Sequence, residues 1–220
     1  MTAEPRTSPE TTSELMADRA YGALRDQIVS LRIAPGAPIN EDALGRELGM
    51  GRTPVREAIK RLALENLVTV FPRRGTFASE INITDLAHIS DVRQQLEGHA
   101  AHRAAERITA AQRTELDELL ARIDARDGAP GEALMRLDAD THRFVYRCAG
   151  NPYLEETLGR YFNLSLRIWH LVLDRLPHLT DRVSEHRALL QAVRDGDPDA
   201  AGRIAADHVV TFAREIRSVL

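Results

Sequence analysis

The sequence predicts a mainly α-helical protein, in which a small N-terminal domain of helices and a β-hairpin precedes an all-α helical bundle. Apolar residues recur at helical spacing along most of the 220 residues, with one β-prone stretch at residues 67–79. Formal charge also divides the chain, because ten Arg or Lys stand against six Asp or Glu over residues 19–79, and eighteen against twenty-two over residues 81–220. This asymmetry indicates two domains with different partners.

The composition is that of a globular protein without a membrane span. Hydrophobic residues make up 43% and charged residues 28% of the chain. No apolar stretch approaches the roughly 20 residues needed to cross a bilayer, and the N-terminal "MTAEPRTSPETTSEL" lacks the apolar core of a secretory signal. The single cysteine, Cys148, excludes an internal disulfide. We expect a cytoplasmic protein with a disordered tail at residues 1–14.

Three helices are expected in the N-terminal domain, over residues 15–80. The first covers about residues 18–33, where apolar residues follow a helical period. Asn40 is placed to cap the second helix, and Gly49 to end it. The third begins within "GMGRTPVREAIKRL", with Thr53 as N-cap and Pro54 as the first helical residue.

A hairpin is expected after the third helix. In "LVTVFPRRGTFAS" two β-prone runs flank Pro72–Gly75. Helix, helix, turn, helix and hairpin within about sixty residues form the outline of a winged helix-turn-helix. The plainer alternative is a three-helix module with a hairpin and no nucleic-acid role.

The third helix has an apolar side and a basic side. A recognition helix needs hydrogen-bond donors near its N-terminus for phosphates and base edges. The hairpin tip adds two arginines that could reach a neighbouring groove or its phosphates. The alternative is a solvated basic face on a structural helix. The candidate DNA-binding residues are Arg52, Thr53, Arg56, Lys60, Arg73, Arg74 and Gly75.

After Ile83 the pattern is helical throughout, and we expect a bundle of about six helices over residues 84–220. Thr84 is placed to cap a long helix that ends near residue 107. Residues 109–112, "TAAQ", form a capping box. Two later helices are expected to start at Asn-Pro and Asp-Pro pairs, with Asn151 and Asp197 as N-caps.

Three histidines and an aspartate stand out in the predicted bundle. Asp138 and His142 are four residues apart and share one helix face, whereas His186 and His208 lie on two further helices. A carboxylate and three imidazoles that meet inside a bundle could bind a divalent transition metal. From the spacing alone, an exposed contact between Asp138 and His142 is the plainer alternative.

Residues 15–80 resemble the DNA-binding half of GntR-type bacterial transcription regulators. The resemblance rests on the spaced run "RTPVREAI…RL…LV…P.RG". It implies that Arg52, Thr53, Arg56 and the hairpin contact double-stranded operator DNA, and that the protein is a homodimer on a roughly palindromic site. Gly51 replaces the Ser or Thr of many relatives, and Asp42 stands where some relatives place a DNA-contacting Arg.

The C-terminal half is similar to the all-helical FCD effector domain of the FadR-type branch of these regulators. The segments "DTHRFVYRCAGNPYL" and "SEHRALLQAVRDGDPDAA", with the later His208, carry this resemblance. It implies that Asp138, His142, His186 and His208 bind zinc, nickel or a similar ion, and that a small organic acid completes the metal's shell. Without a metal, the four residues would form a satisfied polar network.

Further residues are candidates for binding that acid. Arg93 matches a family position near the start of the first effector-domain helix and could pair with a carboxylate; the alternative is an ion pair with Glu97. Asn151 and Arg167 are also ligand-binding candidates, although Asn151 also fits a plain N-cap. Trp169 and His170 are further pocket candidates, although a tryptophan at this spacing also fits a helix core.

The leading hypothesis is a DNA-binding transcription regulator, expected to be a repressor, that responds to a small carboxylate metabolite. A metal-dependent hydrolase is an alternative, but we see no general base, since Glu185 and Asp207 are expected to point away from the candidate ligands. In a third hypothesis the metal itself is the effector.

Overall fold

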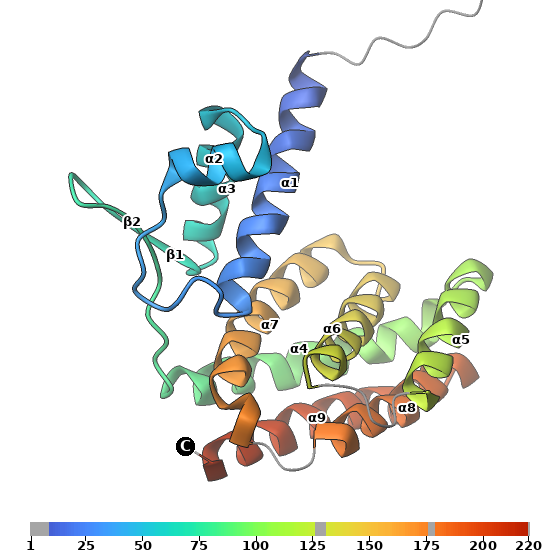
Figure 1. The fold of residues 1–220 in the computed structure, drawn as a ribbon. Coiled ribbons are helices and arrows are strands. Elements are labelled where there is room, and N and C mark those ends of the chain that lie inside the picture. The colour runs from blue at the N-terminus through green and yellow to red at the C-terminus, as the bar shows by residue number, and fades with distance from the viewer. Residues whose placement is uncertain (1–8, 126–130, 176–178, 220) are drawn as a thin grey trace, which may run out of the picture. The chain divides into compact units, whose positions relative to one another are not determined.

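The computed structural model describes residues 9–125, 131–175 and 179–219. The chain forms two compact units, Met1–Ile81 and Asn82–Leu220. Unit 1 contains α1 (Pro9–Val29), α2 (Glu41–Leu48), α3 (Arg52–Leu64), β1 (Val68–Phe71) and β2 (Gly75–Ala78) (Figure 1). Unit 2 contains α4 (Asp85–Arg107), α5 (Ala110–Asp124), α6 (Gly131–Cys148), α7 (Pro152–Val172), a 3₁₀ turn (Leu173–Arg175), α8 (Leu179–Asp195) and α9 (Pro198–Val219). The predicted fold class, a winged helix-turn-helix followed by an all-α bundle, is confirmed.

Helix α1 begins earlier than the sequence pattern indicated. Residues 9–14, which we expected within a disordered tail, form its first turns. Pro9 is the first helical residue, a position where its fixed φ suits the helix and its missing N–H is not needed. The rest of the expected tail, residues 1–8, lies outside the described residues. Further along, Ala20, Leu24 and Ile28 are buried in the core of unit 1.

The turn between α2 and α3 is formed by local chemistry. Asn40 Oδ1 accepts a hydrogen bond from the backbone N–H of Ala43 at 2.9 Å. Gly49 ends α2 in the left-handed conformation, with φ of 63°. Thr53 is not the N-cap of α3: the N-cap is Gly51, and Pro54 is the third helical residue. A proline fits there because the first four N–H groups of a helix have no partner within it.

The two strands pair antiparallel, from Val68 opposite Ala78 to Phe71 opposite Gly75. An isolated bridge between Pro38 and Phe77 attaches this hairpin to the loop between α1 and α2. In that loop the Ile39 N–H donates to the Thr76 carbonyl at 2.8 Å. The hairpin therefore has a fixed base within unit 1, from which its tip projects.

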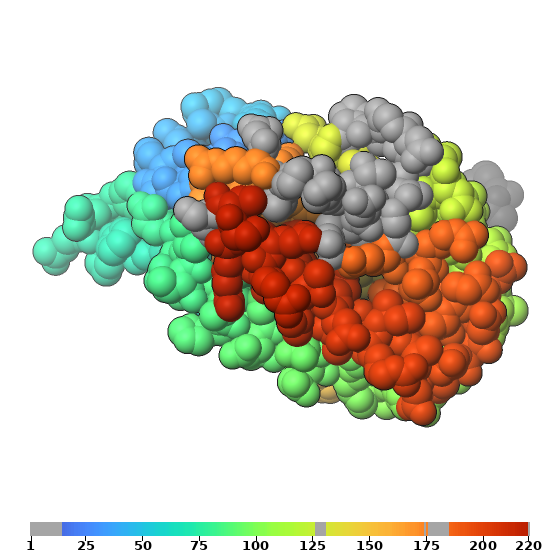
Figure 2. Space-filling model, turned by 90° about the horizontal axis from the view of Figure 1, so that it is seen from below, coloured from blue at the N-terminus to red at the C-terminus, as the bar shows by residue number. Residues whose placement is uncertain are grey.

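Helices α4 and α9 pack closely in unit 2, and Figure 2 shows α9 (red) lying beside α4 (green). Gly98 on α4 faces Gly202 on α9: a Cβ added to either glycine would lie 3.1 Å from the other's carbonyl oxygen. Small residues at this crossing let the two backbones approach. The crossing brings side chains of α4 and α9 into the interior of the bundle.

Most of the expected helix starts in unit 2 are confirmed. Thr109 and Gln112 form the predicted capping box. Asn151 and Asp197 cap α7 and α9 with their side chains. Thr84 precedes α4 as expected, but its side chain does not cap the helix; the Thr84 hydroxyl and N–H both donate to Asn82 Oδ1 instead. Within the described part of the chain, no helix is long and apolar enough to span a bilayer.

Candidate DNA-binding surface and candidate metal centre

Helix α3 separates an apolar face from a basic one, as its sequence predicted. The buried residues of this helix are Val55, Ala58, Ile59 and Leu62. The side chains of Arg52, Arg56 and Lys60 are 61–69% exposed, and Thr53 is also exposed. The exposed side offers guanidinium and ammonium donors within the first three turns, the part of a recognition helix that enters a major groove first.

Both arginines of this face hold a carboxylate from α2, which the sequence analysis did not anticipate. Arg52 Nε lies 2.8 Å from Asp42 Oδ1, and Arg56 Nε lies 2.9 Å from Glu41 Oε2. Lys60 pairs with Glu57 at 2.8 Å on α3 itself. Exposed ion pairs of this kind contribute about 0–1 kcal/mol each. They are therefore weak enough to exchange for phosphate or base contacts.

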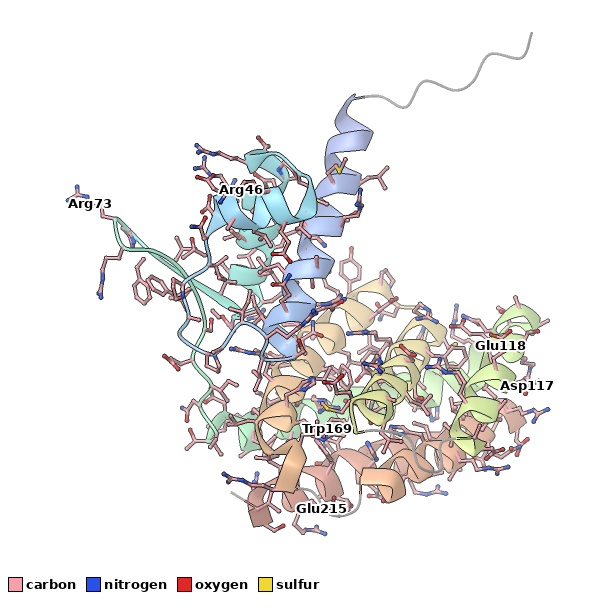
Figure 3. All side chains as sticks on the ribbon, in the orientation of Figure 1. Arg46, Arg73, Asp117, Glu118, Trp169 and Glu215 are labelled. Carbon is pink, nitrogen blue, oxygen red and sulfur yellow. The ribbon has the colours of Figure 1, made fainter. Side chains whose placement is uncertain are left out.

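The hairpin tip carries the other basic candidates. Arg73 occupies the tip (Figure 3) with a left-handed φ of 62°, and Gly75 has φ of 106°. Gly75 suits that conformation because it lacks a Cβ. The Arg74 guanidinium carbon lies 5.7 Å from the centre of the Phe71 ring, a cation–π contact. Both arginines are exposed, so the tip offers two positive charges on a narrow projection.

The four metal candidates converge inside unit 2. Asp138 and His142 come from α6, His186 from α8 and His208 from α9, and all four are buried. Each offers one ligand atom, and these atoms all lie within 4.8 Å of one another. His142 Nε2 and His186 Nε2 are 3.3 Å apart. Asp138 Oδ1 lies 3.4 Å from the His186 nitrogen and 3.7 Å from the His142 nitrogen. We call these four residues the His/Asp cluster.

Two of the three histidines in this cluster are each oriented by a glutamate. Glu97 Oε2 lies 2.9 Å from His142 Nδ1, and Glu185 Oε2 lies 2.9 Å from His208 Nδ1. In both rings Nε2 is the nitrogen left for a metal, an arrangement common around ligating histidines. Glu185 was expected to point away from the cluster, and that expectation was wrong. Its side chain reaches His208 on α9.

The charged groups next to the His/Asp cluster interact closely with one another. Arg93 and Glu97 form a buried ion pair at 2.6 Å. Burial alone would raise the pKa of Glu97, but Arg93 and His142 outweigh it and lower that pKa to about 2. Burial raises the pKa of Asp138, with His142, His208 and Arg93 acting in the opposite direction. A carboxylate buried at this depth is stabilised by a nearby cation.

The cluster fits a transition metal. Asp138 Oδ2 is buried and has no hydrogen-bond partner among the described residues. Three imidazoles and one carboxylate are suitable ligands for zinc or nickel. Three elements supply them from fixed positions in the bundle, so the site is largely formed by the fold itself.

A hollow opens beside the cluster. About 10 Å³ of it is open to a water-sized molecule, roughly the space of one water. It is lined by Arg93, Asp138, His142, Phe162, Ser165, Leu166, Trp169, His208, Val209 and Phe212. Arg93 lines the hollow and pairs with Glu97, so the alternative ion pair is present, whereas a contact between Arg93 and a ligand carboxylate stays a prediction.

The other two ligand-binding candidates are Asn151, which directly precedes α7, and Arg167 on α7. Asn151 caps the helix, because its Oδ1 accepts from the N–H groups of Tyr153 and Leu154. Arg167 is buried but is not among the residues that line the hollow. Two features were not predicted from the sequence: Glu97 as a neighbour of His142, and Ser165 as a lining residue of the hollow. The available signal was their helical spacing from Arg93 and from Trp169.

Comparison with known proteins identifies the family. Residues 88–211 match the FCD domain, and residues 16–78 match the bacterial regulatory proteins of the gntR family. The chain belongs to the GntR family and carries an FCD domain. The winged unit is thus the family's DNA-binding domain, and the His/Asp cluster lies in the FCD domain.

Alignments with curated GntR relatives cover nearly the whole chain. The HTH-type transcriptional repressor RspR of Escherichia coli (strain K12) is 27% identical over 221 residues, covering 100% of this chain and 95% of the relative. An HTH-type transcriptional regulator in an unstable DNA locus of Streptomyces ambofaciens is 30% identical over 199 residues, covering 90% of this chain and 84% of the relative. The chain is a DNA-binding transcription regulator by family, and the family is not one of enzymes.

A solved structure with a similar fold covers most of the chain. E. coli McbR/YncC superposes with a TM-score of 0.81 at 23% identity, covering 92% of this chain and 97% of that one. The winged helix-turn-helix and the helical FCD domain are therefore an architecture that this chain shares with a solved relative.

Proposed function

We propose that the protein is an operator-binding repressor of the bacterial cytoplasm that acts as a homodimer and is controlled by a small carboxylate. The carboxylate binds beside a zinc or nickel ion held by Asp138, His142, His186 and His208. The observation that carries the proposal is the convergence of these four buried side chains next to a lined hollow. A repressor is proposed because characterised relatives such as RspR are named as repressors.

The basic face of α3 supports the DNA-binding part. Its donors are Arg52, Thr53, Arg56 and Lys60, and the hairpin tip adds Arg73, Arg74 and the glycine that shapes it, Gly75. Arg52 and Arg56 can each bind two acceptors of one guanine edge. In a homodimer, two copies of α3 would read two half-sites about one helical turn apart.

The regulatory part follows from linkage between the two binding events. A carboxylate changes operator affinity only if it binds more tightly to one arrangement of the dimer than to another. Arg93 lines the hollow, and a metal held by the His/Asp cluster would add positive charge beside it, which a carboxylate requires. This geometry supports a small anionic effector rather than a neutral one.

The DNA-binding part is tested by replacing single arginines. Arg52→Ala or Arg56→Ala should cost about 1–3 kcal/mol of operator binding if the arginine reads a base, and should relax specificity at that base pair. Binding is measured by electrophoretic mobility shift on DNA upstream of the protein's own operon. Arg136→Ala is the matched control, because it removes the same exposed charge from α6 in the other unit. Equal losses in all three variants, or no shift at low salt, would contradict the proposal.

The regulatory part is tested by loading the metal and then adding acids. The zinc affinity of the full-length protein is measured by competition with a chelator, and His186→Gln should weaken it strongly because one ligand is lost. Operator binding is then compared with and without candidate carboxylates. If zinc alone changes operator binding and no acid adds to its effect, the metal itself is the effector. If neither changes it, the regulatory proposal fails while the DNA-binding part stands.

A further inference from the structure

Arg46 is a basic residue of unit 1 that lies outside the basic face of α3. It stands in the last turn of α2 (Figure 3) and is exposed. Every other Arg or Lys of α2 and α3 pairs with a carboxylate, namely Arg52, Arg56, Lys60 and Arg61. Among the described residues, none forms an ion pair or a side-chain hydrogen bond with the Arg46 guanidinium. This cation therefore has no carboxylate of the described chain to release before it binds a phosphate.

The side of α2 that carries Arg46 borders the basic face of α3. Arg46 follows Asp42 by four residues, so the two side chains lie on one side of the helix, one turn apart. Asp42 holds Arg52 of α3, with Oδ1 and Nε 2.8 Å apart. Glu47 lies on a different side, where its Oε1 accepts a hydrogen bond from Gln27 of α1 at 3.2 Å. The exposed surface of α2 thus places Arg46 toward α3 and Glu47 toward α1.

Helix α2 carries more negative than positive charge. Its sequence, EDALGREL, contains three carboxylates, and Arg46 is its one basic residue. Two of the carboxylates, Glu41 and Asp42, are paired with arginines of α3. In a helix-turn-helix the first helix crosses the DNA backbone while the second enters the major groove. A helix in that position needs a cation beside the phosphates, and within α2 only Arg46 supplies one.

We infer that Arg46 is a DNA-binding residue that contacts a backbone phosphate beside the groove that α3 enters. The inference rests on the DNA-binding part of the proposed function and adds to it a contact from α2. A phosphate carries no sequence information, so this contact positions the unit on the duplex and raises its affinity for any sequence. Because a cation that binds a phosphate releases a condensed counterion, the contact also changes the salt dependence of binding.

The salt dependence of binding tests this contact on the full-length protein. Fluorescence anisotropy measures affinity for labelled DNA upstream of the protein's own operon and for an unrelated duplex of the same length. We expect Arg46→Ala to lower both affinities by the same factor, about 3- to 10-fold at low salt. The slope of log affinity against log salt should become shallower by about 1 for each bound subunit. An unchanged slope, or a loss confined to the operator, would overturn the inference.

Two further variants separate a phosphate contact from a role in folding. Arg46→Lys keeps the positive charge and should retain most of the affinity and slope, because an ammonium binds phosphate as a point charge. Arg203→Ala on α9 is the matched control and should change neither, since Arg203 is exposed in the other unit and no described residue forms an ion pair with it. Arg46→Ala should unfold at the wild-type urea concentration, because it removes an exposed side chain without a partner. Equal losses in Arg46→Lys and Arg46→Ala would overturn the inference.

The same measurements separate this inference from the proposed function. If the wild type binds its operator and Arg46→Ala matches it at every salt concentration, the inference fails while the DNA-binding proposal stands. If the wild type binds neither duplex at low salt, the DNA-binding proposal fails and the inference fails with it. If Arg52→Ala loses its preference for the operator whereas Arg46→Ala keeps it, the division between base contact and phosphate contact is supported.

Discussion

Arg52 and Arg56 each face solvent and hold a carboxylate of α2. Of the two carboxylates, Asp42 is the more exposed, and it lies 2.8 Å from Arg52. A negative charge at this position repels the phosphates that α3 would approach, and it also has to release Arg52 before that side chain can reach a base. The residue is therefore expected to set operator affinity without being a DNA contact itself.

Asp42→Asn should raise operator affinity by about 2- to 5-fold at low salt, because it removes one exposed ion pair and one repulsive charge. The gain should shrink as salt is raised, since exposed charges are screened. The measurement is a salt series of operator affinities. Asp26→Asn on α1, which loses an exposed charge paired with Arg25, serves as the control. Lower affinity in Asp42→Asn would mean that Asp42 positions Arg52 for DNA.

The sequence predicted the roles of some individual residues but not of others. Asn40, Thr109 and Asn151 were assigned as caps correctly, because a cap depends on residues within one helical turn. The partners of Arg52 and His142 could not be predicted. Each ion pair depends on how two helices cross, and helix crossing is not encoded in the spacing of one segment.

At the scale of elements, the crossing of α4 and α9 determines whether the candidate site exists. Arg93 and Glu97 come from α4, and His208 comes from α9. Gly98 and Gly202 set how closely these helices approach. The period of each helix was visible in the sequence, but neither glycine was identified as a crossing point. A glycine inside a helix has the same local signature whether it faces solvent or another backbone.

Gly98→Val should destabilise the protein by about 1–3 kcal/mol, because its Cβ would lie 3.1 Å from the Gly202 carbonyl oxygen and 3.4 Å from the Ala206 Cβ. The measurement is urea unfolding. Gly159→Val on α7 is the matched control, since a Cβ there meets nothing within 4 Å. Its effect should stay within about 0.5 kcal/mol. Equal stability of the two variants would mean that the crossing adjusts without cost.

At the scale of the whole molecule, the chain combines two compact units with separate chemistry. The family resemblance made both units and the four members of the His/Asp cluster predictable. Ser165 and the two orienting glutamates were not, since isolated polar residues in an amphipathic helix have no distinctive pattern. Trp169 is the chain's single tryptophan and lies in unit 2 (Figure 3), so its fluorescence reports on that unit.

Metal binding should stabilise unit 2 selectively. Zinc at about 100 times its dissociation constant adds about 2.7 kcal/mol to a folded state that alone binds it, which raises an unfolding midpoint by roughly 8 °C in a unit of this size. Thermal unfolding followed by Trp169 emission should show this shift, and a chelator should reverse it. His186→Gln should show no shift. An unfolding midpoint that changes neither on addition of zinc nor on addition of the chelator would contradict metal binding by the His/Asp cluster.

Most residues that line the hollow and are not candidate metal ligands come from one helix, α7. α7 contributes Phe162, Ser165, Leu166 and Trp169, whereas the His/Asp cluster lies on α6, α8 and α9. If an effector binds in the hollow as proposed, substitutions along a single face of α7 would alter which molecule fits, while the His/Asp cluster and the basic face of α3 remain as they are. Under that proposal, a duplicated gene would need only a few substitutions on α7 to respond to a new signal at the old operator.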